Sequence, residues 1–203
     1  MIDVYIGDVE KFCDNREYPS CIADELEKIS NDRVADEKRA VYGLLKYAMA
    51  ESLGMVDCIK NISKTESGKP YCDNCFFSLS HAGGIVVAAV SMKNEVGVDV
   101  EPICDKNRDA IAKRNLSEAE QNEYFSLDED RREKYFLKIW TQREAAYKLS
   151  DEKAPFVASK TADEGNIYKT VLIKGQKKRY VLTVACKNDE EIRFVGRDHE
   201  VNC

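Results

Sequence analysis

The stretch EVGVDVEPI, residues 95–103, carries the pattern from which the fold can be worked out. Its three valines alternate with other residues, as in a half-buried β-strand. The valines share one face, and Asp99 and Glu101 share the other, which we expect to face solvent. Two carboxylates about 7 Å apart repel each other, and neither residue type favours a strand. This face is expected to hold a cation, although a lone D-x-E pattern is also typical of a solvated strand face.

The pattern of strands and helices around this stretch predicts an α+β fold built from two halves. Before it, strands are predicted at residues 1–9, 75–80 and 85–92, and helices at 21–30 and 34–54. After it, helices are predicted at 108–116, 117–125 and 128–150, and strands at 166–174, 179–186 and 191–196. Each half therefore reads as a strand, then helices, then further strands. We divide the chain into an N-terminal half, 1–93, and a C-terminal half, 94–203, which carries the carboxylates, with a ligand cleft expected between them.

Local signals fix several of these boundaries. Gly54 suits the C-terminal cap of the helix at 34–54. The residues His81-Ala82-Gly83-Gly84 are typical of a hairpin between two strands. Ser117 and Glu120 have the spacing of a capping box, which predicts that a helix begins there.

The long helix at 128–150 changes character along one face. Phe136, Ile139 and Trp140 lie at i, i+3 and i+4, which predicts a buried stripe. The same spacing leads next to Arg143 and Glu144, so the inward face turns from apolar to charged. That change predicts a functional end of the helix.

Glu144 can complete a set of three carboxylates with Asp99 and Glu101. Oxygen ligands of this kind suit Mg²⁺, with Mn²⁺ as the alternative, and Mg²⁺ commonly takes substrate phosphate oxygens as well. Lys148 follows Glu144 by one helical turn. The alternative is that Glu144 and Lys148 form an exposed pair worth a few tenths of a kcal/mol.

Two segments of the first half suit an anion. His81 follows Ser80 at the end of a strand and precedes two glycines, which offers an imidazole, a hydroxyl and exposed amides. Lys69 lies in the turn Gly68-Lys69-Pro70. Taken alone, His81 and Lys69 are equally well read as turn residues without a role.

Composition excludes several classes of protein. With 43% hydrophobic and 33% charged residues, the 203-residue chain is expected to be a globular protein with a sizeable core. Its net charge of −6 argues against general affinity for nucleic acid, while leaving room for a local basic pocket. No apolar run approaches the roughly 20 residues of a membrane span, and the N-terminus does not resemble a signal peptide. We expect a cytoplasmic monomer that binds neither nucleic acid nor membrane.

The eight cysteines are predicted to be reduced thiols. Their spacings are irregular, and Cys72 and Cys75 form a C-x-x-C without the second pair of ligands that a structural zinc site needs. Buried or loop thiols are therefore the expected state.

Four motifs occur in an order that resembles a known family. They are G-K-P at 68–70, F-x-L-S-H-x-G-G at 77–84, G-V-D-V-E at 97–101 and W-T-Q-R-E-A-A-Y-K at 140–148. Together they resemble the motifs of the 4′-phosphopantetheinyl transferases of the surfactin-synthetase-activating type. The segment D-E-K-R-A-V-Y-G-L-L at 36–45 is similar to that family's N-terminal helix. The resemblance runs from about residue 30 to residue 150, and the last fifty residues match only in strand content.

The resemblance implies a pseudo-dimer of two similar α+β halves with coenzyme A in the cleft between them. It implies Mg²⁺-dependent transfer of the 4′-phosphopantetheine arm of coenzyme A to a serine of an apo acyl or peptidyl carrier protein, with release of 3′,5′-ADP. Two alternatives remain. One is a metal-dependent phosphohydrolase, and the other is a non-catalytic relative that binds carrier proteins or coenzyme A.

The resemblance also implies roles for individual residues. Asp99, Glu101 and Glu144 would hold the metal on the pyrophosphate, Glu144 is the expected base, and Lys148 would contact phosphate. The residues expected at the coenzyme A site as a whole are Arg39, Lys69, Pro70, Ser80, His81, Asp99 and Lys148, with Arg39 near the 3′-phosphate.

One residue departs from the family pattern, and the partner surface is a separate expectation. Arg143 stands where the family usually has lysine, which keeps the positive charge and changes its geometry. For the carrier protein, we expect docking at the basic pair Lys113 and Arg114, which favours fast association. A second expected surface is the segment at 153–157, where Phe156 would act as an apolar anchor. The alternative is that Phe156 belongs to the core and that Lys113 and Arg114 are only solvated surface charges.

Overall fold

The computed structural model describes residues 1–13, 18–150, 165–175, 178–196 and 199–202, and it has the mixed α+β architecture predicted from the sequence. The strands are β1 (Ile2–Asp8), β2 (Ser63–Lys64), β3 (Pro70–Tyr71), β4 (Phe76–Ala82), β5 (Ile85–Ser91), β6 (Val96–Ile103), β7 (Ile167–Lys174), β8 (Arg179–Cys186), β9 (Ile192–Gly196) and β10 (Glu200–Asn202). The helices are α1 (Val9–Phe12), α2 (Ser20–Glu27), α3 (Asp32–Leu53), the 3₁₀ helix η1 (Cys58–Asn61), α4 (Asp109–Asn115), α5 (Glu118–Ser126) and α6 (Glu129–Ser150). Among the helices so described, none is long and apolar enough to cross a membrane.

One topology occurs twice. The two four-stranded sheets have the strand orders β4-β5-β1-β9 and β10-β7-β8-β6. In the first sheet, β1 is followed by the 22-residue helix α3 and then by the hairpin β4–β5, whose second strand pairs with β1. In the second sheet, β6 is followed by the 22-residue helix α6 and then by β7 and β8, and β8 pairs with β6. This repeat agrees with the pseudo-dimer that the resemblance implied, and the division at residues 93 and 94 stays a prediction.

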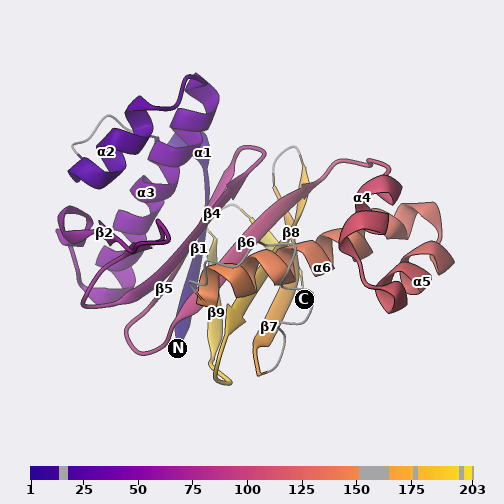
Figure 1. Cartoon of the computed structure of the whole chain (residues 1–203). Helices are drawn as coiled ribbons and strands as arrows, with labels where there is room; N and C mark the ends of the chain where they lie inside the picture. The colour runs from indigo at the N-terminus through magenta and orange to yellow at the C-terminus, as the bar shows by residue number, and fades with distance from the viewer. Residues whose placement is uncertain (14–17, 151–164, 176–177, 197–198, 203) are drawn as a thin grey trace.

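The two sheets pack face to face, with a long helix on each outer side. Their inner faces share one apolar cluster, which includes Val4 and Val87 of the first sheet and Val98, Val100 and Leu182 of the second. Helix α3 covers the outer face of the first sheet, and α6 lies across the outer face of the second (Figure 1). The valine face of β6 is therefore buried in the shared core, as the alternation in the sequence predicted.

The first sheet also takes a strand from the far end of the sequence. Strand β9 pairs in parallel with β1, with Ile2 opposite Ile192 and Ile6 opposite Gly196. Strand β10 returns to the second sheet and pairs with β7. Residues 192–196 and 200–202 thus join different sheets, a connection that the division of the sequence into two halves does not contain.

The buried stripe of α6 differs from the predicted one. Phe136 is buried, but Ile139 and Trp140 are only half-buried, and the centre of the stripe follows Leu137, Thr141, Ala145 and Leu149. The small side chains of this row let the helix lie close on the sheet, whereas a prediction from large apolar residues favours the neighbouring row.

Helix α6 touches the backbone of β6 at Gly97. A Cβ atom added to this glycine would lie 1.9 Å from the carbonyl oxygen of Ala145. The face of β6 that carries Asp99 is therefore covered by the helix, and our expectation that this face is open to solvent was wrong. Asp99 is only 6% exposed.

The predicted turn and cap signals are confirmed. Gly54 ends α3 in the left-handed region at φ 68°, and Gly83 and Gly84 form the β4–β5 turn at φ 62° and 101°. Ser117 and Glu120 make both hydrogen bonds of a capping box at the start of α5. The six cysteines whose side chains the structure describes are free thiols.

Candidate functional site

A cavity of about 340 Å³ opens between α3, the turn before β3, strand β4 and the C-terminal end of α6. Its basic lining side chains are Lys38, Lys69, Lys148 and His81, and no carboxylate is found among the described residues that line it. The remaining lining residues are Val41, Tyr42, Ser67, Gly68, Pro70, Phe77, Ser78, Leu79 and Tyr147. Three lysines at one cavity, in a chain with a net charge of −6, suit an anionic ligand, which would share Lys38 with Glu25 and Lys148 with Asp99. The aromatic and aliphatic walls suit a ligand with an apolar or ring portion as well.

The cavity brings together four of the seven residues that were expected at the coenzyme A site: Lys69, Pro70, His81 and Lys148. The ammonium group of Lys69 donates to the carbonyl oxygen of Leu149 at 3.3 Å, which ties the turn before β3 to the end of α6. These four residues come from segments about 80 positions apart, so the fold assembles this part of the predicted site.

Arg39 is placed differently. Its guanidinium pairs with Asp36 at 2.9 Å, one turn back along α3, and Lys38 lines the cavity in its stead. Successive residues of a helix point about 100° apart, so neighbours in sequence face different surroundings. Sequence analysis missed Lys38 because the resemblance directed attention to Arg39. The sign that could have identified Lys38 is its place on the side of α3 that faces β4. The same side of α3 carries the buried Tyr42.

Lys148 connects this cavity to the carboxylate of Asp99. Its ammonium group donates to Asp99 Oδ1 at 2.8 Å, to the carbonyl oxygen of Val98 at 3.1 Å and to Ser80 Oγ at 3.2 Å. Ser80 Oγ in turn donates to Asp99 Oδ1 at 2.9 Å. Residues from β4, β6 and α6 therefore meet at one carboxylate, where the two sheets adjoin.

Serine side chains of β4 hold β6 in place at this junction. Ser78 Oγ accepts from the backbone N–H of Val98 at 3.0 Å, and Ser80 Oγ accepts from that of Val100 at 3.2 Å. The two strands are not directly paired, so these hydroxyls satisfy backbone groups that a neighbouring strand would otherwise satisfy. Ser80 thereby has a structural contact as well as a contact with Asp99.

His81 lies at the rim of the cavity beside an acid. Its Nδ1 is 3.2 Å from a carboxylate oxygen of Glu37 on α3. The imidazole is therefore oriented by the helix that also supplies Lys38. This contact favours a positioned ring over a turn histidine without neighbours.

The three carboxylates of the predicted metal site influence one another. Burial raises the pKa of Glu144, and the nearby charge of Asp99 raises it further, while Lys148 opposes both. Burial likewise raises the pKa of Glu101, with Asp99 and Glu144 acting in the same direction and Arg108 against. The charge of Asp99 thus makes it harder for both glutamates to ionise, and Glu144 adds to this effect on Glu101.

The chemistry of these donors fits a divalent cation. Asp99 Oδ2 is buried and has no hydrogen-bond partner among the described residues. A buried carboxylate oxygen normally has a partner, and three mutually repelling acids are relieved by a cation. In the arrangement described, however, no three His, Cys, Asp or Glu side chains stand ready to hold one ion together. The fit therefore rests on the unpartnered oxygen and the donor set.

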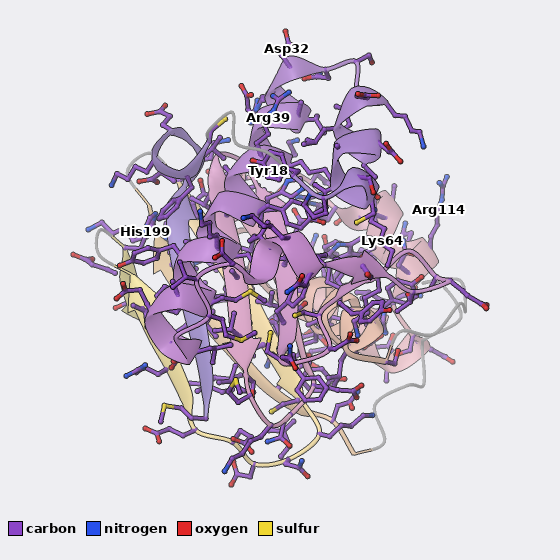
Figure 2. All side chains as sticks on the ribbon, turned by 90° about the vertical axis from the view of Figure 1, so that its left-hand side faces the viewer. Tyr18, Asp32, Arg39, Lys64, Arg114 and His199 are labelled. Atoms are coloured by element: carbon purple, nitrogen blue, oxygen red, sulfur yellow. The ribbon has the colours of Figure 1, made fainter. Side chains whose placement is uncertain are left out.

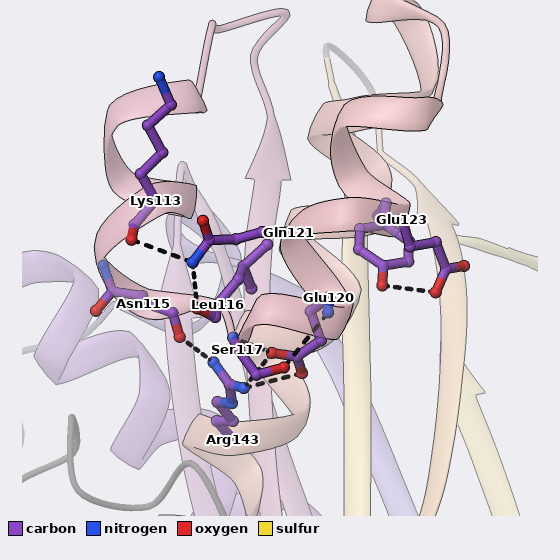
Figure 3. Close-up of polar contacts among 9 residues, drawn as sticks. Lys113, Asn115, Leu116, Ser117, Glu120, Gln121, Glu123 and Arg143 are labelled. Carbon is purple, nitrogen blue, oxygen red and sulfur yellow. Dashed lines mark hydrogen bonds and ion pairs between the residues drawn. The ribbon is translucent and has the colours of Figure 1, made fainter.

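The side chain of Arg143 reaches the turn between α4 and α5 (Figure 3). Its Nη2 contacts both carboxylate oxygens of Glu120, at 2.9 and 2.7 Å, and its Nη1 donates to the carbonyl oxygen of Asn115 at 2.5 Å. The positive charge of Arg143 is therefore paired with Glu120 of α5, although Glu144 is the next residue in the chain.

Of the two docking stretches expected from the sequence, the structure describes one. Lys113 and Arg114 are exposed on α4, and Figure 2 shows Arg114 extending from the surface. The segment at 153–157, with Phe156, lies outside the described residues.

Comparisons with known proteins agree with the motifs. Residues 95–187 match the family model of the 4′-phosphopantetheinyl transferase superfamily. The chain is 40% identical over 93 residues to the 4′-phosphopantetheinyl transferase psf-1 of Bacillus pumilus, which covers 44% of this chain and 39% of that protein. It is 26% identical over 142 residues to the 4′-phosphopantetheinyl transferase HetI of Nostoc sp., covering 64% of this chain and 59% of that protein.

A third relative is a putative 4′-phosphopantetheinyl transferase of Synechocystis sp., 31% identical over 76 residues. The aligned parts span between 31% and 59% of the lengths of these three relatives. The family match covers β6, α4 to α6, β7 and β8, and so includes Asp99, Glu101, Glu144 and Lys148. Over this stretch, a little less than half of the chain, the protein is similar to the 4′-phosphopantetheinyl transferase superfamily.

Proposed function

We propose that this protein transfers the 4′-phosphopantetheine group of coenzyme A to a serine of an apo acyl or peptidyl carrier protein and releases 3′,5′-ADP. The proposed enzyme is of the surfactin-synthetase-activating type and depends on Mg²⁺, which Mn²⁺ can replace. The observation that carries the proposal is the meeting, at Lys148, of a positively charged cavity and a group of three carboxylates. Coenzyme A offers a matching ligand, with a phosphorylated nucleotide, a pyrophosphate and a slender apolar arm.

The cavity residues bind and orient coenzyme A in this proposal. Lys38 and Lys69 supply positive charge for its phosphates, His81 adds a ring nitrogen for hydrogen bonding, and the aromatic walls contact the ring or the arm. Arg39, one turn from its partner Asp36, remains our proposed contact for the 3′-phosphate. Binding the nucleotide firmly places the pyrophosphate beside Lys148 and the carboxylates.

In the reaction, the oxygen of the carrier serine forms a bond with the β-phosphorus, the one attached to pantetheine. The bond between that phosphorus and the bridging oxygen breaks, and 3′,5′-ADP leaves with the electron pair. Lys148 stabilises the charge that gathers on the leaving oxygen, because its ammonium group is held at the junction by Asp99, Ser80 and the carbonyl of Val98.

Glu144 accepts the proton of the carrier serine. A serine hydroxyl is a poor nucleophile until its proton is removed. The raised pKa of Glu144 makes its carboxylate a stronger base than an ordinary glutamate, and burial is the main cause. Asp99, Glu101 and Glu144 would hold Mg²⁺, which when bound neutralises pyrophosphate charge.

The test is intact-mass analysis of apo carrier proteins incubated with this protein, coenzyme A and Mg²⁺. The expected result is the gain of one phosphopantetheine on the carrier, with an equal amount of 3′,5′-ADP. Release of free phosphopantetheine without a modified carrier would identify a metal-dependent phosphohydrolase. Tight binding of coenzyme A or a carrier without any turnover would identify a non-catalytic relative.

A further inference from the structure

Arg143 holds two structural units together. Its side chain is only 12% exposed, and its guanidinium reaches Glu120 at the start of α5 and the last residue of α4, Asn115, at the same time. The planar guanidinium provides two nitrogens for these contacts, which a single ammonium group does not. The neighbouring acid favours this pairing, since the hydrogen bonds of Ser117 and the charge of Arg143 keep the pKa of Glu120 low against the effect of burial.

The contact lies at the turn that joins α4 and α5, and other polar groups stiffen this turn. Glu120 accepts from the backbone N–H of Ser117 at 2.7 Å, which closes the capping box of α5. The side-chain amide of Gln121 donates to the carbonyl oxygens of Leu116 at 2.8 Å and Lys113 at 3.3 Å (Figure 3). Helices α4 and α5 therefore form one unit, and Arg143 fastens it to α6 at the residue before Glu144.

This unit does not contribute to the cavity. The cavity is lined from α3, the turn before β3, β4 and α6, and its described lining residues include none from α4 or α5. The outer surface of α4 instead exposes Ile111, Lys113 and Arg114. A change that loosens α4 and α5 should therefore leave coenzyme A binding intact and alter what approaches from outside.

We infer that Arg143 is a positioning residue for the protein acceptor: it fastens the α4–α5 unit to α6 beside Glu144, and it acts on the carrier protein and not on coenzyme A. The inference of an acceptor role rests on the proposed function. The contact with Glu120 itself does not, and the two are tested by different measurements.

The kinetic arm uses Arg143→Met, Arg143→Lys and Glu120→Gln, with Arg131→Met as a matched control on the exposed start of α6. Arg143→Met should raise the KM for an apo carrier protein about tenfold or more, while the Kd for coenzyme A by calorimetry stays within twofold. Arg143→Lys should be intermediate, because one ammonium group keeps the ion pair and loses the tie to Asn115. The double variant Arg143→Met/Glu120→Gln should be no worse than Arg143→Met alone.

Three kinetic results would overturn the inference. An unchanged carrier KM with a lower melting temperature would leave Arg143 a purely structural residue. A fall in kcat alone would place it in the chemistry. A weaker Kd for coenzyme A of the same size as the carrier effect would place it at the cavity.

The second measurement, hydrogen–deuterium exchange, does not depend on enzymatic activity. Hydrogen–deuterium exchange of the free protein should show faster exchange of residues 109–126 in Arg143→Met, with residues 32–53 of α3 and the control Arg131→Met unchanged. Unchanged exchange in 109–126 would overturn the fastening role. If the wild-type protein transfers nothing to any carrier, the proposed function and the acceptor role fail together, and exchange still decides whether Arg143 fastens the helices.

Discussion

The ammonium nitrogen of Lys148 lies 2.8 Å from Asp99 Oδ1, across the contact between α6 and β6. The lysine reaches the cavity and the acid is almost fully buried, so the pair links the cavity to the proposed metal-binding carboxylates. The other oxygen of the same carboxylate has no partner among the described residues. One carboxylate oxygen of Asp99 is thus hydrogen-bonded within the protein, and the other can accept a cation.

Replacing Asp99 should affect both activity and stability. Asp99→Asn keeps the shape but removes the charge that pairs with Lys148 and the oxygen offered to the metal. Turnover should fall at least about 100-fold. Loss of the charged pair should cost about 1–3 kcal/mol, or roughly 2–12 °C in Tm for a chain of this size. Turnover assays and a circular dichroism melt measure the two effects. A lowered Tm with full activity would contradict the role of Asp99 at the metal.

Glu144→Gln should lower the activity and raise the stability of the protein. Folding disfavours the ionised form of this acid, because burial and the charge of Asp99 raise its pKa above the ordinary 4.5. The ionised carboxylate therefore lowers the stability of the metal-free protein at neutral pH, and this penalty is lost as the pH falls through the raised pKa. The variant should have a higher Tm than wild type at pH 7 and an equal Tm below about pH 4.

The same substitution should lower turnover by at least about 100-fold if Glu144 is the base. Glu95→Gln is a suitable control, because Glu95 is an exposed acid just before β6. Melting curves in chelator from pH 4 to pH 8 test the stability prediction. A lower Tm for Glu144→Gln at pH 7, or activity near that of the wild type, would contradict this account of the residue.

Two neighbouring cations on α3 should differ in their effect on coenzyme A. Lys38→Met should weaken coenzyme A about 10-fold or more, because a charged hydrogen bond contributes roughly 1.5–3 kcal/mol. Arg39→Met should weaken coenzyme A much more than 3′-dephospho-coenzyme A if Arg39 contacts the 3′-phosphate. Calorimetry with both ligands measures these constants. Equal losses for the two ligands would show that Arg39 is not at the 3′-phosphate.

The basic pair on α4 should govern encounter with the carrier. Lys113→Glu with Arg114→Glu should raise the carrier KM and flatten its dependence on salt, because long-range attraction to an acidic partner is removed. Coenzyme A binding should stay unchanged, since neither residue lines the cavity. Kinetics at two salt concentrations provide the measurement. A carrier KM that does not move would exclude this surface as the dock.

Much of the fold could be predicted because it follows from local patterns. The alternation around Asp99 predicted the strand, and the capping box at Ser117 and the glycine pair at 83–84 predicted where elements begin and turn. The sequence pattern did not predict what covers each face of the strand. Gly97 lacks a side chain that would keep α6 away, so the helix covers the acids, and a pattern of polar and apolar residues does not contain that approach distance.

The candidate site was predictable only in part for a similar reason. Lys69, His81 and Lys148, which the motifs had grouped, lie at the same cavity because the motifs are on elements that the repeated topology places together. It did not separate Lys38 from Arg39, since the direction of a helical side chain depends on how the helix is rotated against its sheet. Nor did it find the partner of Arg143, which is set by the packing of α5.

The parallel pairing of β1 with β9 has a consequence for how the chain is made. During synthesis, residues 2–91 can form their helix and hairpin early, but the edge of β1 stays uncovered until residues 192–196 have left the ribosome. Contacts separated by about 190 positions also slow folding, because a very long loop must close before they form. We therefore expect nascent chains to fold late and as one unit, with the cavity between α3, β4 and α6 acquiring its rigid frame only after residues 192–196 have been made.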